Sequence, residues 1–275
     1  MALRALGLPT LALLMLCSPA AAGELIHAAI RNTTGPQRVN KPDLKPHAAL
    51  VDFELSHFGG FDHKVHAVVV RGGTGGARFE LTDGQTRRLP TYDAKARWFQ
   101  DEALSGRTAT VQQRCRVRCL IPLPRTDGQW VLGGFSLRRP GQKEDFVLQL
   151  AVQVEPSQRH VEVIFRDKGR DVDFDAIVDL VSVPKALIRG TASPKGHTDR
   201  NVVQLGRPRR GELPLLAGFD VRFLNSDHKL RSLIVRSGGG ASTHSVYFWD
   251  ARPDDPFEAA LQLVYVAQPQ ARRRR

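Results

Sequence analysis

The sequence predicts an all-β protein made of three tandem, small antiparallel β-sandwich units. Three observations carry this prediction. One stretch of sequence recurs along the chain, and short segments alternate apolar with polar residues. A third is that clusters of glycine, proline and aspartate separate these segments, as turns separate strands. Strands at roughly ten-residue spacing, with little helical periodicity, are typical of sandwiches and small barrels.

Internal similarity is clearest between residues 163–183 and 246–266. With a constant offset and no gap, nine of the 21 positions are identical. Upstream, "LGGFSLRR" (132–139) resembles "LAGFDVRF" (216–223), and a third copy begins with "LVDFELSHF" (50–58). These similarities identify an internal repeat, which has to be established before the fold is assigned.

The leading aromatic residues of the repeat are Phe53, Phe135 and Phe219, which lie 82 and 84 residues apart. Each unit is near the lower size limit for independent stability, so we expect the units to pack on one another. A pseudo-trimer within one chain is one such arrangement. The predicted units, the first the most degenerate and the last ending in a basic tail, are 23–107, 108–190 and 191–275.

Alternating segments predict the strands within each unit. Examples are "VLQLAVQVE" (147–155), "HVEVIF" (160–165) and "LRSLIVRS" (230–237). The last segment, "FEAALQLVYV" (257–266), also alternates and favours a strand, although Asp255-Pro256 before it could instead begin a short helix.

The first 22 residues have the composition of a secretory signal peptide. Arg4 provides a positive start, residues 5–17 are apolar, and Ala20-Ala21-Ala22 forms a cleavage site. We therefore expect a secreted or periplasmic protein. No later stretch reaches the roughly 18 apolar residues of a membrane-spanning helix, so no transmembrane segment is predicted.

The formal charge of +12 predicts attraction to anionic surface polymers rather than recognition of a specific nucleic acid. The tail Arg272–Arg275 is expected to be an electrostatic arm. The sequence contains no nucleophile elbow, zinc-protease motif or phosphate-binding loop, and we predict that the protein is not an enzyme.

Two cysteines follow the signal peptide, Cys115 and Cys119. An oxidising compartment favours a disulfide between them. On one straight strand their Cα atoms would lie about 13 Å apart, which is too far for a bridge. The predicted disulfide therefore requires the chain to turn between them.

An acidic turn near the end of the repeat is the first candidate site. The last unit contains Asp250, Asp254 and Asp255 after Trp249, and the middle unit contains Asp167 and Asp171. Such carboxylates can accept hydrogen bonds from sugar hydroxyls, and an outward tryptophan can contact a sugar ring. They could also bind Ca²⁺, although the spacing matches no defined calcium loop, or simply shape the turn. Whether any metal binds is left open.

A second candidate is the pair of turns that contain Asp62-His63 and Asp227-His228. Each turn could form a polar contact with a ligand or a histidine–carboxylate pair. The alternative is a solvated turn before a strand, in which the aspartate bonds the backbone.

The order of features in each unit resembles the H-type lectin domain of secreted agglutinins. That order is a Gly-Phe strand, an Asp-His turn, a valine-rich strand and an acidic turn, with "FWDA" (248–251) before the last strand. The resemblance covers about 50 residues of each unit. It implies small antiparallel β-sandwiches that form trimers and bind sugar near the clefts between subunits.

The predicted function is that of a secreted, non-enzymatic protein that recognises carbohydrate or a cell-surface polymer. An envelope structural or adhesion protein and a basic polyanion-binding protein are the alternatives. The sequence leaves the oligomeric state open.

Overall fold

The computed structural model describes residues 23–57, 63–83, 90–141, 143–169, 171–237, 243–250 and 255–268. The predicted signal peptide, the tail Arg272–Arg275 and the candidate residues Asp62 and Asp254 lie outside the described residues. Among the described residues, no helix has the length and apolar character needed to cross a membrane.

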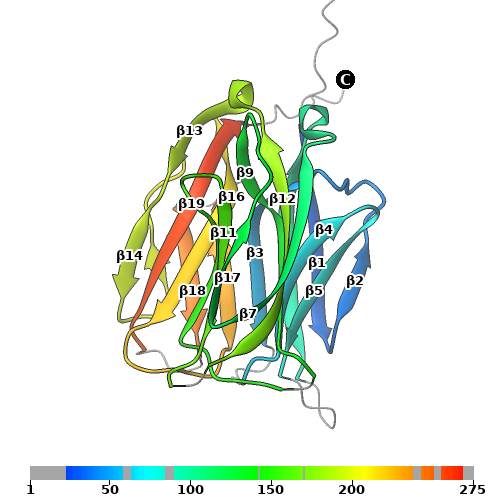
Figure 1. Cartoon of the computed structure of the whole chain (residues 1–275). Helices are drawn as coiled ribbons and strands as arrows, with labels where there is room; N and C mark the ends of the chain where they lie inside the picture. Colours follow the sequence, from blue (N-terminus) through cyan, green and yellow to red (C-terminus); the bar gives the residue numbers. More distant parts are fainter. Residues whose placement is uncertain are drawn as a thin grey trace, which may run out of the picture.

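The chain is all-β and its strands pair antiparallel (Figure 1). The strands from the first predicted unit are β1 (Glu24–Thr33), β2 (Gln37–Asn40), β3 (Ala49–His57), β4 (Ala67–Gly73), β5 (Gly76–Thr82) and β6 (Tyr92–Gln100). Those from the second are β7 (Thr108–Arg116), β8 (Arg118–Pro122), β9 (Gln129–Arg138), β10 (Gln149–Val154), β11 (His160–Arg166) and β12 (Asp173–Val183).

The remaining strands are β13 (Ile188–Ala192), β14 (Lys195–Thr198), β15 (Val203–Gln204), β16 (Glu212–Phe223), β17 (Ser232–Arg236), β18 (Ser245–Trp249) and β19 (Phe257–Ala267). The segment after Asp255-Pro256 is thus a strand, as its alternation predicts. The single-turn 3₁₀ helices η2 (Glu102–Leu104) and η3 (Lys185–Leu187) also connect strands.

These strands form three open antiparallel sheets. Sheet I has the order β1-β6-β3-β17-β18-β15, and sheet II has the order β7-β12-β9-β4-β5-β2. Sheet III has the order β13-β19-β16-β10-β11-β8, with β14 also paired to β19. In the described residues, the strand pairing that joins sheet II to sheet III is the pair of Arg116 on β7 with Arg118 on β8.

Each strand that carries a leading phenylalanine pairs with a strand from a different repeat. β3 pairs with β17, β9 pairs with β4, and β16 pairs with β10. The repeats are therefore connected in a cyclic order, first to third, second to first and third to second. Isolated bridges follow a cyclic order as well: His63 with Leu230, Val65 with Asp145, and Val147 with His228.

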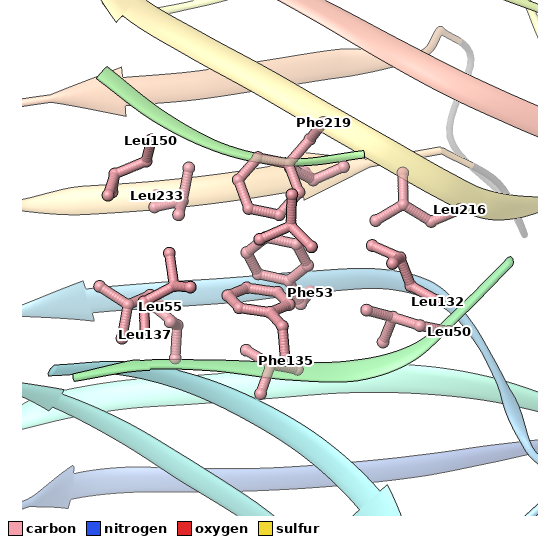
Figure 2. Packing of buried hydrophobic residues seen from close by; sticks show 14 of the residues in the cluster. Leu50, Phe53, Leu55, Leu132, Phe135, Leu137, Leu150, Leu216, Phe219 and Leu233 are labelled. Carbon is pink, nitrogen blue, oxygen red and sulfur yellow. The ribbon is translucent and has the colours of Figure 1, made fainter. Parts of the chain in front are cut away.

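The core is centred on the three leading phenylalanines. Phe53, Phe135 and Phe219 are fully buried, and their ring centroids lie 5.3, 5.4 and 5.2 Å apart in the three pairwise combinations. Figure 2 shows these rings at the centre of the cluster with leucines on both sides. Because the strands alternate, the same positions that predicted the repeat supply this shared core.

Each leading strand contains a β-bulge two residues before its phenylalanine. The extra residues are Val51 on β3, Gly133 on β9 and Ala217 on β16. A bulge bends its strand and redirects the side chains beyond it. Val51 and Ala217 accordingly pack in a second, smaller apolar cluster with residues such as Phe99.

Cys115 and Cys119 form a disulfide, with Cα atoms 5.5 Å apart. The chain turns between them at Val117, which has a φ of +62°. The tight turn thus brings the two Cα atoms within the distance that a disulfide needs, which a straight strand would not do. It also places β7 beside β8.

We expect Phe135→Ala to lower the free energy of unfolding by about 3–5 kcal/mol, because the cavity would remove ring contacts with both other repeats. Denaturant unfolding measures the change. Leu120→Ala is the matched control at an exposed side chain and should change stability by no more than about 0.5 kcal/mol. Equal effects of the two substitutions would contradict the central role of the phenylalanine trio.

Candidate functional site

The outer face of sheet III carries a polar groove. Along β10, β11 and β16 the inward residues, such as Leu150 and Phe165, are buried in the core. The alternate residues point outward, and Gln149, Glu162 and Asp220 are among them. These outward side chains come from the second and third repeats, since β10 and β11 belong to one and β16 to the other.

The groove consists of two hollows that meet at Asp220. The larger is about 770 Å³ and is lined by Val117, Arg118, Gln149, Glu162, Ile164, Arg166, Asp167, Gly169, Asp171 and Asp220. The smaller is about 460 Å³ and is lined by Lys195, Gly196, His197, Asp220, Glu258, Ala259 and Ala260. Together they extend across β14, β19, β16, β10, β11 and the start of β8, and end at the disulfide turn.

Hydrogen bonds hold the floor of the groove. Gln149 Nε2 donates to Asp220 Oδ1 at 2.8 Å, and Arg118 forms an ion pair with Glu162. Burial raises the pKa of Asp220, the hydrogen bond from Gln149 opposes this effect, and repulsion from Glu162 and Glu258 adds to it. The groove therefore has donors, acceptors and charges of both signs fixed in place.

Asp167, at one end of the groove, belongs to a cluster of three carboxyls. It is 4% exposed, and burial together with hydrogen bonds to the carboxyls of Asp145 and Asp227 raises its pKa to about 8. Repulsion from the same two groups raises this pKa further, while Arg139 pairs with Asp145 at 3.3 Å. At neutral pH the three carboxyls therefore share a proton, which one of them can donate to another in a hydrogen bond.

The structure brings together Asp167 and Asp227, two residues predicted in separate turns. They come from different repeats, the second and the third. Sequence reasoning missed Asp145, the third member of the cluster. Its signal was present, because Asp145 occupies in the middle repeat the position that His63 and His228 occupy in the others.

A histidine–carboxylate group forms in the last repeat. His228 Nδ1 lies 3.0 Å from Asp250 Oδ2 and 3.3 Å from Asp255 Oδ2, and the Phe223 ring lies against the imidazole. One atom of each polar group lies within 4.8 Å of the others. One nitrogen and two carboxylates suit Zn²⁺ better than Ca²⁺, which prefers oxygen ligands throughout.

The first repeat has a related pair that is only partly equivalent. His63 Nδ1 lies 3.2 Å from Asp83 Oδ2, and the His57 ring lies 4.5 Å from the His63 ring. Burial, with a smaller contribution from His63, lowers the pKa of His57 to about 3, so His57 is neutral at physiological pH. Sequence reasoning missed His57 and Asp83 as neighbours of His63.

The remaining candidates are separate from these groups. Trp249 points outward on sheet I, where the Arg231 guanidinium lies 4.2 Å from its ring centroid. It therefore lies on a different sheet from the groove that Asp167 borders. Asp171 lines the larger hollow and pairs with Arg116 at an exposed position.

The chain matches no protein-family model, and it has no significant match among curated proteins.

We expect Asp167→Asn to change how stability depends on pH. Because the pKa of Asp167 is raised on folding, the native state binds more protons than the unfolded state between about pH 4 and pH 8, and stability falls as pH rises through this window. Asparagine cannot ionise but still donates a hydrogen bond. The stability advantage of the variant should therefore grow from pH 4 to pH 8 and then level off.

Urea unfolding at pH 4, 6 and 8.5 measures this difference. Asp171→Asn is the control, since it makes the same substitution at an exposed side chain of the same hollow. Parallel pH profiles for wild type and Asp167→Asn would contradict a shared proton in this carboxyl cluster.

Proposed function

We propose that this protein is a secreted, non-enzymatic carbohydrate-binding protein whose ligand lies in the groove on sheet III. The observation that carries the proposal is the groove itself, in which two hollows of about 770 and 460 Å³ meet at Asp220. Volumes of this size are ordinary for ligand sites in proteins. The sequence pointed to the acidic turn of the last repeat as the ligand site, and we propose the groove in its place.

The chemistry of the lining suits sugar hydroxyls, which both donate and accept hydrogen bonds. Glu162 and Asp220 supply acceptors, Arg118 and Arg166 supply donors, and Gln149 supplies both. Ile164 and Val117 add apolar surface against which the C–H groups of a sugar ring can pack. Fixed polar groups of this kind give specificity, because a ligand that leaves them unpaired is rejected.

The shape of the groove favours an extended ligand. It crosses six neighbouring strands, which at the usual strand spacing span roughly 24 Å. A single sugar ring would occupy one hollow only. We therefore propose an oligosaccharide or a polysaccharide chain as the ligand, held across the strands.

The proposal includes a pseudo-trimeric arrangement of the three repeats within the chain. The cyclic pairing of β3, β9 and β16 with strands of other repeats supports it, as does the mutual contact of the three phenylalanines. Residues of two repeats line the groove, in keeping with the resemblance to H-type lectins, where sugar binds near clefts between subunits.

Secretion or export to the periplasm is part of the same proposal. The signal-peptide pattern of the first 22 residues and the Cys115–Cys119 disulfide support it, since disulfides persist in oxidising compartments. An envelope structural or adhesion role is the alternative, and the following experiment separates the two.

A glycan array of neutral oligosaccharides, read at 0.1 M and 0.5 M NaCl, tests the proposal. We expect binding that survives the higher salt, because hydrogen bonds in a groove are screened less than exposed charges. Asp220→Asn should weaken this binding about tenfold, since the central carboxylate accepts from the ligand. Asp127→Asn, at a highly exposed carboxylate outside the groove, should leave it unchanged.

Ala260→Tyr adds a test of ligand length, because it fills the smaller hollow alone. Binding of long oligosaccharides should weaken while binding of disaccharides persists. A folded protein that binds no glycan would overturn the proposal and favour the structural role.

A further inference from the structure

Three arginines lie side by side on the outer face of sheet II. Arg38 on β2 is directly opposite Arg78 on β5, and Arg78 is directly opposite Arg71 on β4. We call these three residues the arginine row. Directly opposed residues of antiparallel strands have Cβ atoms about 4.5–5.5 Å apart, and like charges in such pairs destabilise the sheet.

One carboxylate neutralises one member of the row. Arg71 donates from Nε and an Nη atom to the two oxygens of Asp179, at 2.6 and 2.8 Å, and Thr110 Oγ1 donates to the same carboxylate. Gly134 lies between Arg71 and Asp179 in the sheet, and a Cβ there would come within 2.7 Å of the Arg71 Cα. The missing side chain lets the ion pair form across β9.

Arg38 and Arg78 have no ion pair with any carboxylate in the described part of the chain. Both are exposed. The row therefore presents two uncompensated guanidinium groups beside a third that is already paired. A bound anion would reduce the repulsion between the opposed arginines and would also neutralise this excess positive charge.

The arginine row borders a hollow of about 210 Å³, completed by the glycine-rich turn at residues 72–76. A Cβ at Gly76 would lie 3.3 Å from Arg38 Nε, so the Arg38 side chain crosses the turn at the edge of the hollow. With about a quarter of the volume of the larger hollow on sheet III, it suits a small anionic group rather than a sugar chain.

The fold does not require arginines in this row. The corresponding row of sheet III, which also passes a glycine just before a leading phenylalanine, contains Leu120, Glu162 and Gln153. In sheet I the corresponding positions are Gln204, Ser245 and Arg236. The concentration of positive charge is thus peculiar to one sheet and has no structural explanation in the repeat.

We propose that the arginine row binds the sulfate or phosphate group of an anionic polymer. Guanidinium groups hold tetrahedral oxyanions through paired, charge-assisted hydrogen bonds, and the two uncompensated arginines can donate to different oxygens of one such group. The site lies on β2, β5 and β4, whereas the groove extends toward β14, and Figure 1 places β2 and β14 on opposite sides of the molecule. This site does not depend on the proposed sugar ligand.

The test uses the Arg38→Gln/Arg78→Gln double variant of the full mature chain. Inorganic sulfate and inorganic phosphate are compared with NaCl at equal ionic strength for their effect on thermal unfolding. Binding to immobilised heparin and to polyphosphate is then measured, which separates sulfate from phosphate as the source. Arg189→Gln/Arg207→Gln removes the same charge from two exposed positions outside the row and serves as the control.

We expect sulfate or phosphate to raise the unfolding temperature of wild type and of the control beyond the effect of NaCl, and not that of the double variant. Affinity for the polymer should fall at least about tenfold in the double variant. Without anion the double variant should be as stable as wild type or more so, because the opposed charges are gone. Should it fold poorly, Arg78→Gln alone gives the same comparison.

An equal loss of polymer affinity in the control would overturn the site in favour of general charge attraction. Failure of all four probes to bind wild type would also overturn the site. Neutral-glycan binding is measured on the same variants and should not change. Failure of the arginine row and failure of the groove are therefore distinguishable.

Discussion

The fold depends on one constraint: the leading strand of each repeat has an edge whose hydrogen bonds its own repeat does not satisfy. β9 pairs with β12 on one side, and β4 from another repeat completes the other side. β3 and β16 meet the same need with β17 and β10. Since unpaired edges expose backbone groups and invite aggregation, pairing across repeats both protects the edges and brings the three phenylalanines together.

Because the inward side chains form the shared core, the outer faces of the sheets can differ in sequence. Inward positions are held to large apolar side chains, because a close-packed core tolerates little change in volume. Outward positions carry no such restriction, and the same row is Leu120, Glu162 and Gln153 on one sheet but three arginines on another. Differences in chemistry between repeats are therefore found outside the shared core.

The sequence predicted what local patterns determine. Alternation predicted the strands, and the repeat identified Phe53, Phe135 and Phe219, because both depend on short-range periodicity. It did not predict which strands pair across repeats, since such pairing joins segments far apart in the chain. For that reason Trp249 and Asp167, which occur at nearly equivalent places in two repeats, were grouped as one kind of site although they lie on different sheets.

The places where local rules fail are the places where chemistry is expected. A carboxyl beside two others at Asp167 and arginines directly opposed at Arg38 and Arg78 each oppose stability, whereas the buried phenylalanines agree with every level of the pattern. Sequences that specify one fold are consistent across levels, and departures concentrate at functional positions. A core shared by three repeats can stabilise such departures. Each departure affects one sheet or one contact between repeats, whereas the three phenylalanines stabilise all three repeats.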